Sequence, residues 1–136
     1  MTTTINAVAG TGLVQTSDAS GIIKLQSAGV TTNALAWCNF DGTTGTRRAS
    51  YNVTSVTRNA TGDYTLTFTN AMADINYAFL ASVSVDSGGT NPIVVVDSLP
   101  GLPVTPTTTT TRMIVVTRST GAAIDPTYVQ VAVFGN

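Results

Sequence analysis

The chain has 136 residues, 43% of them hydrophobic, and this size and apolar content fit one globular domain rather than a disordered segment. Charged residues make up only 10% of the chain, with six Lys and Arg against seven Asp and no Glu, so we expect no nucleic-acid partner. The 26 Thr and 16 Val favour β-strands and exclude an all-α protein.

The first third of the chain carries sparse apolar residues. Short apolar patches such as Leu13-Val14 and Ile22-Ile23 are separated by glycine and small polar residues, and they cannot build a core unaided. The opening lacks a cationic stretch, and no apolar run approaches the ~18 residues that span a bilayer, so we expect no signal peptide and no membrane insertion. We predict that residues 1–33 form an extended arm for attachment and trimerisation, and that residues 34–136 form the folded domain.

The folded domain is expected to begin with a strand over residues 34–40. Leu35 and Trp37 fall on one face of this strand, whereas Cys38 and Phe40 fall on the other, and we expect both faces to be partly covered. Residues 41–45 then form a turn by composition.

The clearest local pattern lies between residues 48 and 69. Residues 48–57 alternate as a strand, residues 59–63 supply turn chemistry, and Tyr64, Leu66 and Phe68 then alternate strictly with Thr. We predict a β-hairpin with one buried face, in which these three large side chains belong to the core.

Further strands follow toward the C-terminus. Residues 99–111 hold three Pro and a run of five Thr, so we expect an exposed connection there. The remaining apolar or alternating segments predict strands over residues 77–85, 93–96, 112–118 and 128–134. About eight strands with short turns predict an all-β fold, an antiparallel, jelly-roll-like β-sandwich with an extended N-terminal arm.

Few residues are suited to chemistry. The chain has no His, and Cys38 is its one cysteine, which excludes internal disulfides, paired-cysteine zinc sites and the usual general base. We interpret Cys38 as a buried structural thiol rather than a nucleophile, because no His could activate it. We therefore predict no catalytic residue, no metal site and no cofactor.

The acidic residues coincide with predicted turns. We interpret them as hydrogen-bonding their own turn backbone, with a carboxylate pair or an oxygen-ligand calcium site as the alternative. The seven positions are Asp18, Asp41, Asp63, Asp74, Asp86, Asp97 and Asp125.

Three further groups admit a structural and a binding interpretation. Arg47 and Arg48 could grip an anionic partner, but neighbouring strand residues point to opposite faces, so we predict one structural ion pair and one solvated side chain. Glycines at 10, 12, 42 and 45 are interpreted as turn residues rather than a phosphate loop. Trp37 and Tyr51 could stack a sugar ring, although most of the nine aromatics are expected inside.

Several motifs in order resemble a β domain of tailed-phage and prophage virion proteins, often found at the ends of tail fibres. The matching segments are residues 36–44 (AWCNFDGTT), 48–56 (RASYNVTSV), 61–69 (TGDYTLTFT), 71–72 and 76–78, preceded by residues 12–21 and 25–26. The chain departs from the family pattern at Cys38, where an aliphatic residue is usual, at the Arg47-Arg48 doublet, and at Ala73, where proline is common.

This resemblance implies a virion structural protein assembled in the host bacterial cytoplasm, usually a homotrimer, with no catalytic residues. We expect a short tail fibre or fibre tip that contacts other baseplate or tail proteins and takes a host-surface glycan as ligand. A capsid decoration protein bound to the major capsid protein is the first alternative, and a free carbohydrate-binding module is the second. A glycan-active enzyme is disfavoured because its usual paired carboxylates and general acid are missing.

Overall fold

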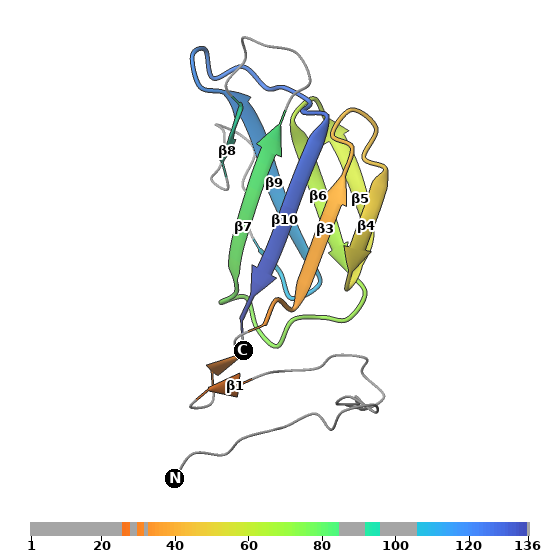
Figure 1. The fold of residues 1–136 in the computed structure, drawn as a ribbon, viewed down its shortest axis with the longest axis vertical. Helices are drawn as coiled ribbons and strands as arrows, with labels where there is room; N and C mark the ends of the chain where they lie inside the picture. The colour runs from red at the N-terminus through yellow and green to blue at the C-terminus, as the bar shows by residue number, and fades with distance from the viewer. Residues whose placement is uncertain (1–25, 28–29, 32, 85–91, 96–105, 136) are drawn as a thin grey trace, which may run out of the picture.

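The computed structural model describes residues 26–27, 30–31, 33–84, 92–95 and 106–135, and this described part contains strands and turns but no helix. Eight of its strands form two four-stranded antiparallel sheets that pack face to face (Figure 1), which confirms the predicted all-β sandwich. These strands are β3 (Ala36–Phe40), β4 (Arg47–Tyr51), β5 (Val53–Ala60), β6 (Asp63–Phe68), β7 (Ala78–Ser84), β8 (Pro92–Val95), β9 (Thr110–Thr117) and β10 (Tyr128–Phe134).

The predicted arm lies largely outside the described residues. Within it, β1 (Gln26–Ser27) and β2 (Val30–Thr31) pair with each other as a two-stranded antiparallel ladder. The expected role of residues 1–33 in attachment stays a prediction.

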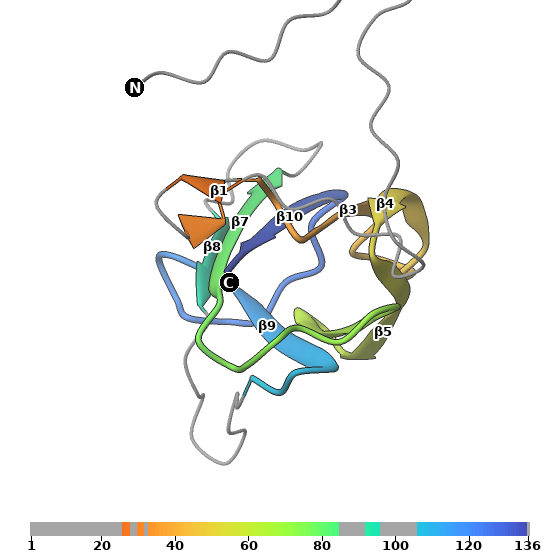
Figure 2. The same cartoon turned by 90° about the horizontal axis from the view of Figure 1, so that it is seen from below.

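The strand order joins the two ends of the folded domain. One sheet has the order β4-β3-β10-β7 and the other β5-β6-β9-β8, so the first and last strands of the sandwich pair at the centre of one sheet. Seen along the strands, the two sheets form opposite walls around the core (Figure 2). This arrangement leaves each sheet with one inner and one outer face.

The core confirms the alternation predicted for β6. Tyr64 and Leu66 are fully buried and Phe68 is almost so, whereas Thr65 and Thr67 between them are partly exposed. The Tyr64 ring packs edge-on against Phe40 of the opposite sheet, with ring centroids 5.2 Å apart. Period-two burial on β6 therefore supplies large side chains that hold the two sheets together.

The single strand predicted over residues 48–57 is wrong, because the chain changes sheet at Asn52. Asn52 has a φ of 54°, in the left-handed region that Asn tolerates better than β-branched or bulky residues. Its side-chain Nδ2 donates to the Leu35 carbonyl at 3.0 Å, and its Oδ1 accepts from the Asn70 backbone N–H at 2.7 Å. Consequently β4 pairs with β3, and the predicted hairpin is formed by β5 and β6 alone.

The hairpin turn is shorter than predicted. β5 continues to Ala60 and β6 begins at Asp63, so Thr61 and Gly62 make the connection rather than residues 59–63. Gly62 has a φ of 68°, and a Cβ there would lie 2.4 Å from the Val115 carbonyl oxygen. Glycine is required at this position by both conformation and space.

The threonine run is also partly misassigned. Thr110 and Thr111 open β9, and Thr111 is buried, so the exposed connection ends earlier than predicted. Before it, Thr107 Oγ1 accepts from the backbone N–H groups of Thr109 and Thr110, a local turn motif. Residues 99–105 lie outside the described part of the chain.

Candidate binding face

The outer face of the sheet β4-β3-β10-β7 carries large side chains that are not covered by the described fold. We call it the aromatic face and define it by Trp37, Tyr51, Leu80, Tyr128 and Ala132. Four of these lie in one cross-strand row, with Leu80 opposite Ala132, Ala132 opposite Trp37, and Trp37 opposite Tyr51. The row therefore crosses the whole sheet, which faces the viewer in Figure 1.

Exposure singles out this face. Trp37 is 40% exposed, Leu80 55% and Tyr128 39%, and these are three of the five large hydrophobic side chains exposed in the described residues. Alternation explains the orientation of Trp37, because Ala36, Cys38 and Phe40 of the same strand point into the core. Contiguous apolar exposure of this kind marks interaction surfaces on soluble proteins.

Trp37 is therefore an exception to the expectation that most aromatics lie inside. Leu35, expected on the same face, precedes β3 and is buried at 3% exposure. Its backbone N–H donates to the Val133 carbonyl, which fixes it at the sheet end. The alternation of inward and outward side chains therefore holds within β3, but it does not extend to Leu35, which precedes the strand.

A hollow lies beside Trp37 on the same face. It is open, has a volume of about 320 Å³ and is lined by Leu80, Ala81, Ser82, Gln130, Val131 and Ala132. The Ser82 hydroxyl donates to Gln130 Oε1 at 2.9 Å, so its two polar side chains bond to each other. Asn39, opposite Gln130 in the register, has a buried Oδ1 without a hydrogen-bond partner.

Arg48 borders the aromatic face, with its charge already paired. Its guanidinium lies 4.5 Å from the centre of the Tyr128 ring and 2.9 Å from Asp41 Oδ2, and it donates to the Thr127 carbonyl. This confirms the predicted structural ion pair. Arg47 is not simply solvated as predicted, because it donates to Ser50 Oγ and to the Val53 carbonyl.

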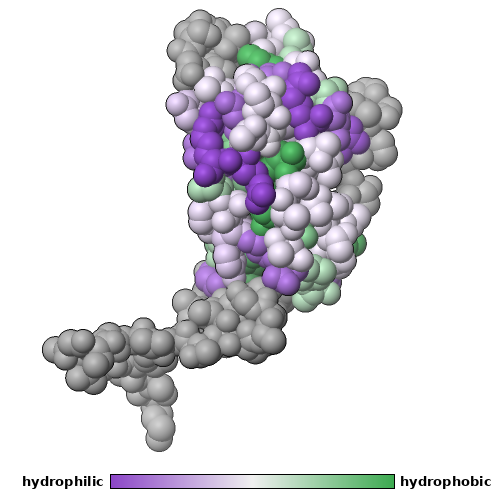
Figure 3. All heavy atoms as spheres, turned by 90° about the vertical axis from the view of Figure 1, so that its right-hand side faces the viewer, coloured by the Kyte–Doolittle hydropathy of each residue, from purple (hydrophilic) through white to green (hydrophobic). Residues whose placement is uncertain are grey.

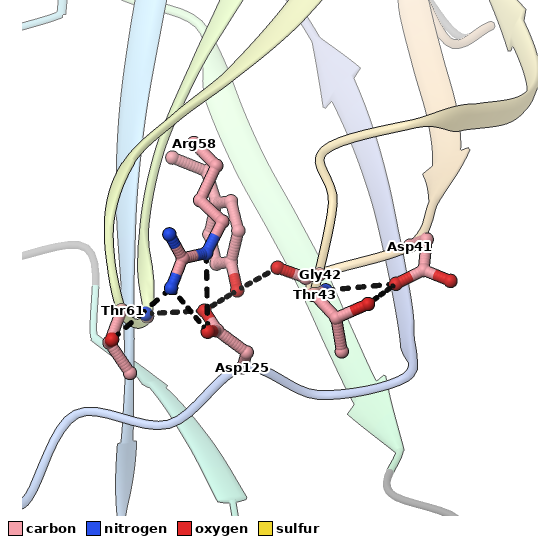
Figure 4. Close-up of polar contacts among 8 residues, drawn as sticks. Asp41, Gly42, Thr43, Arg58, Thr61 and Asp125 are labelled. Carbon is pink, nitrogen blue, oxygen red and sulfur yellow. Dashed lines mark hydrogen bonds and ion pairs between the residues drawn. The ribbon is translucent and has the colours of Figure 1, made fainter.

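Asp125 organises a second polar cluster, at the end of the sandwich (Figure 4). Its Oδ2 accepts from Arg58 Nη2 at 2.6 Å, and its Oδ1 accepts from the Gly62 backbone N–H at 2.8 Å. The Tyr64 hydroxyl lies 2.7 Å from the same Oδ1 and 2.8 Å from the Gly42 carbonyl oxygen. Burial alone would raise the pKa of Asp125, but the hydrogen bonds from Arg58, Gly62 and Tyr64 outweigh it and lower that pKa.

The turn interpretation holds for two of the four described aspartates. Asp41 accepts from the Thr43 backbone N–H, and Asp74 accepts from that of Asn76, as Asx turns do. Asp125 instead joins segments distant in sequence, and Asp63 opens β6 and pairs with Arg112. Asp18, Asp86 and Asp97 lie outside the described residues.

Cys38 is buried, as predicted. Burial raises the pKa of its thiol to about 11, so the reactive thiolate is scarce near neutral pH. Within the described residues, no three His, Cys, Asp or Glu side chains lie together as metal ligands would. Gly42 lies in the turn as expected, and it is also required for space, because a Cβ there would lie 2.3 Å from the Pro126 carbonyl oxygen.

Hydrophilic side chains gather on a different part of the surface. They cover the upper part of the edge formed by β4 and β5 (Figure 3). The exposed polar residues of these two strands include Arg47 and Arg48 of β4 and Arg58 and Asn59 of β5. No described segment is a helix long and apolar enough to cross a membrane.

Comparisons with protein-family models, with curated proteins and with solved structures found no match for this chain. The geometry of the aromatic face and of the three Arg–Asp pairs is therefore the basis for assigning a function. Sequence reasoning singled out Trp37, Tyr51 and Arg48 but missed Leu80, Asn52 and the Arg58–Asp125 pair. Of these, only Asn52 could have been found from the sequence, because Asn tolerates positive φ and stands within an alternating strand pattern.

Proposed function

We propose that this chain is a non-enzymatic structural protein of a tailed-phage particle, working as a trimeric short tail fibre or fibre tip. The resemblance to phage β domains supports the proposal through residues that are continuous in the fold. They run from β3 through β6 to the start of β7 and cross from one sheet to the other at Asn52. Five of the matching segments thus fall on consecutive strands and turns, whereas residues 12–21 lie outside the described part of the chain.

The aromatic face is the observation that carries the proposal. It exposes Trp37, Leu80 and Tyr128 on one sheet, next to a shallow hollow and with its bordering Arg48 already paired. Docking of such a surface against another surface is favourable, because removing apolar area from water stabilises the complex by roughly 25 cal/mol per Å². A protein whose role is to assemble into a particle needs a surface of this kind.

Binding without chemistry is supported by the engagement of the described carboxylates. Asp63 and Asp125 are held by arginines, whereas Asp41 and Asp74 cap turns. A hydrolase would need a carboxylate placed to donate or accept a proton at the substrate. We propose that a host-surface glycan is bound, without turnover, by parts of the surface that assembly leaves exposed.

Localisation on purified particles is the decisive experiment. Antibodies raised against the purified chain should label the tail end of intact particles in electron microscopy, and mass spectrometry should find the chain in those particles. Label on the head would favour the decoration alternative instead. Absence from particles together with binding on a glycan array would overturn the virion assignment in favour of a free carbohydrate-binding module.

Catalysis needs a separate assay. Purified protein is incubated with host polysaccharide, and released reducing ends are measured. We expect no release; turnover that disappears in Asp125→Asn or Asp41→Asn would contradict the binding-only proposal.

A further inference from the structure

We propose that the aromatic face is the surface through which copies of this chain contact one another. This inference rests on the trimeric state proposed above and adds the location of the contact. Its starting point is the row of Leu80, Ala132, Trp37 and Tyr51, which is continuous across all four strands of the sheet.

The composition of the face matches the anatomy of a protein interface. Interface centres are enriched in Trp, Tyr and Arg and depleted of acidic residues and Lys, and polar side chains surround them. Here the apolar row is followed, one step along the strands, by Ser82, Gln130 and Asn39, which lie opposite one another in the register. Arg48 and Tyr128 stack at the next step.

Charge favours a second copy as the occupant. The row and its polar neighbours carry no formal charge, and the bordering Arg48 is neutralised by Asp41 at 2.9 Å. Neighbouring copies can bring different parts of this face together without desolvating an unpaired ion, which is the expensive step in burying charged surfaces. A strongly charged partner would find no complement here.

The hollow also favours a protein side chain over a small polar ligand. Its volume of about 320 Å³ is at the lower end for ligand pockets, and it is open to solvent. Ser82 and Gln130 are the two polar side chains of its lining, and the other four lining residues are apolar, so the hollow presents few polar side chains to a sugar. An exposed aromatic such as Trp37 of a neighbouring copy would bury its ring there, and such head-to-tail contacts close into a ring under three-fold symmetry.

Trp37 allows a direct test, because it is the one tryptophan of the chain. The mass of the full-length protein is measured by light scattering, and acrylamide quenching of tryptophan emission is measured at the same concentrations. We expect a mass of about three times 14.0 kDa and a quenching constant at least threefold lower than in the dissociated chain.

The matched variants are Leu80→Glu on the aromatic face and Thr57→Glu, an exposed position on the outer side of the other sheet. Leu80→Glu should weaken self-association at least tenfold and restore quenching, while Thr57→Glu should leave both unchanged. Circular dichroism verifies folding; should Leu80→Glu fail to fold, the exposed Ser82→Glu at the hollow makes the same test.

The outcomes separate the two proposals. A trimer whose Trp37 is quenched as readily as in the dissociated chain overturns the aromatic face as the contact and leaves the trimer standing, with the face free for a ligand such as a sugar. A wild-type monomer at micromolar concentration contradicts the trimer itself. A dimer with protected Trp37 supports the contact surface and contradicts only the proposed stoichiometry.

Discussion

The two sheets of this sandwich have the same number of strands but differ in the side chains on their outer faces. On the sheet β5-β6-β9-β8, the outward side chains Thr65, Thr67, Thr110 and Arg112 form what we call the threonine face. Arg112 Nε donates to Asp63 Oδ1 at 2.8 Å, and Asn59 donates both to that oxygen and to Thr65 Oγ1.

The aromatic face exposes three large hydrophobic side chains, Trp37, Leu80 and Tyr128, whereas the strands of the other sheet expose one in the described residues, Ile93 of β8. Ser82 donates a hydrogen bond to Gln130, and Arg48 forms an ion pair with Asp41. The apolar surfaces of Trp37 and Leu80 remain exposed, and covering them would be favourable. The comparison teaches that a low-charge β protein can complete one face with local polar bonds and leave the other for assembly. Four substitutions or titrations test how each region is stabilised.

The largest effect is expected beneath the threonine face. Leu66 is fully buried between the sheets, so Leu66→Ala should lower the free energy of unfolding by about 2–5 kcal/mol through lost burial and a residual cavity. The adjacent Thr67→Ala, on the outer side of the same strand, should cost about 0.5 kcal/mol or less. Urea denaturation measures both; similar losses would mean that the two faces of β6 are misassigned.

The next effect concerns the ion pair that anchors the threonine face. Arg112→Met keeps the aliphatic stem but leaves Asp63, whose side chain is only 7% exposed, without its main partner. We expect a loss of about 2–3 kcal/mol, because an almost buried carboxylate without its charged donor is costly. The exposed Arg118→Met is the control and should change the free energy of unfolding by less than about 0.5 kcal/mol. Equal effects of the two variants would show that the pair is a solvent-screened surface contact.

The junction between the two sheets should respond to substitution at Asn52. Asn52→Ala loses the hydrogen bonds to Leu35 and Asn70, and alanine is strained at positive φ. We therefore expect the free energy of unfolding to fall by about 2 kcal/mol. Asn52→Gly keeps the backbone conformation accessible and should lose about 1 kcal/mol, from the hydrogen bonds alone. Thermal unfolding ranks the two, and a glycine variant less stable than the alanine variant would contradict a left-handed conformation there.

The smallest of the four effects is expected from acid, which should lower the free energy of unfolding by protonating Asp63 and Asp125. The hydrogen bonds from Arg112 hold the pKa of Asp63 below its ordinary value despite burial, and the pKa of Asp125 is lowered in the same direction. Groups with a lowered folded-state pKa stabilise the fold above their unfolded pKa of about 3.9, and this contribution is lost as the pH falls through the folded value. We expect a loss of about 1–2 kcal/mol below pH 4, moderated by solvent screening.

The same titration should show little change between pH 5 and 8, because the chain has no His. Asp125→Asn should flatten part of the acid limb in urea denaturation series. A stability midpoint near pH 6–7 would contradict the assignment of these carboxylates as ionised in the folded state.

Local alternation made much of the fold predictable. The strand over residues 128–134 was predicted at its observed bounds, and Tyr64, Leu66 and Phe68 were correctly assigned to the core. Both predictions depend on a period of two, which is a property of the extended backbone itself. Low charge and the absence of His and Glu likewise restrict the chemistry that the side chains can perform.

The sequence by itself thus determined most of the strand content, the inward residues of β6, the bounds of β10, and the small repertoire of reactive groups. Only the tertiary structure decided that Asn52 transfers the chain between sheets, that Arg58 and Asp125 meet across 67 positions, and that Trp37 faces outward. The physical reason is that alternation separates two faces of a strand without stating which one another sheet will cover. Coverage depends on pairings such as β3 with β10, which join the two ends of the folded domain and leave no local mark in the sequence.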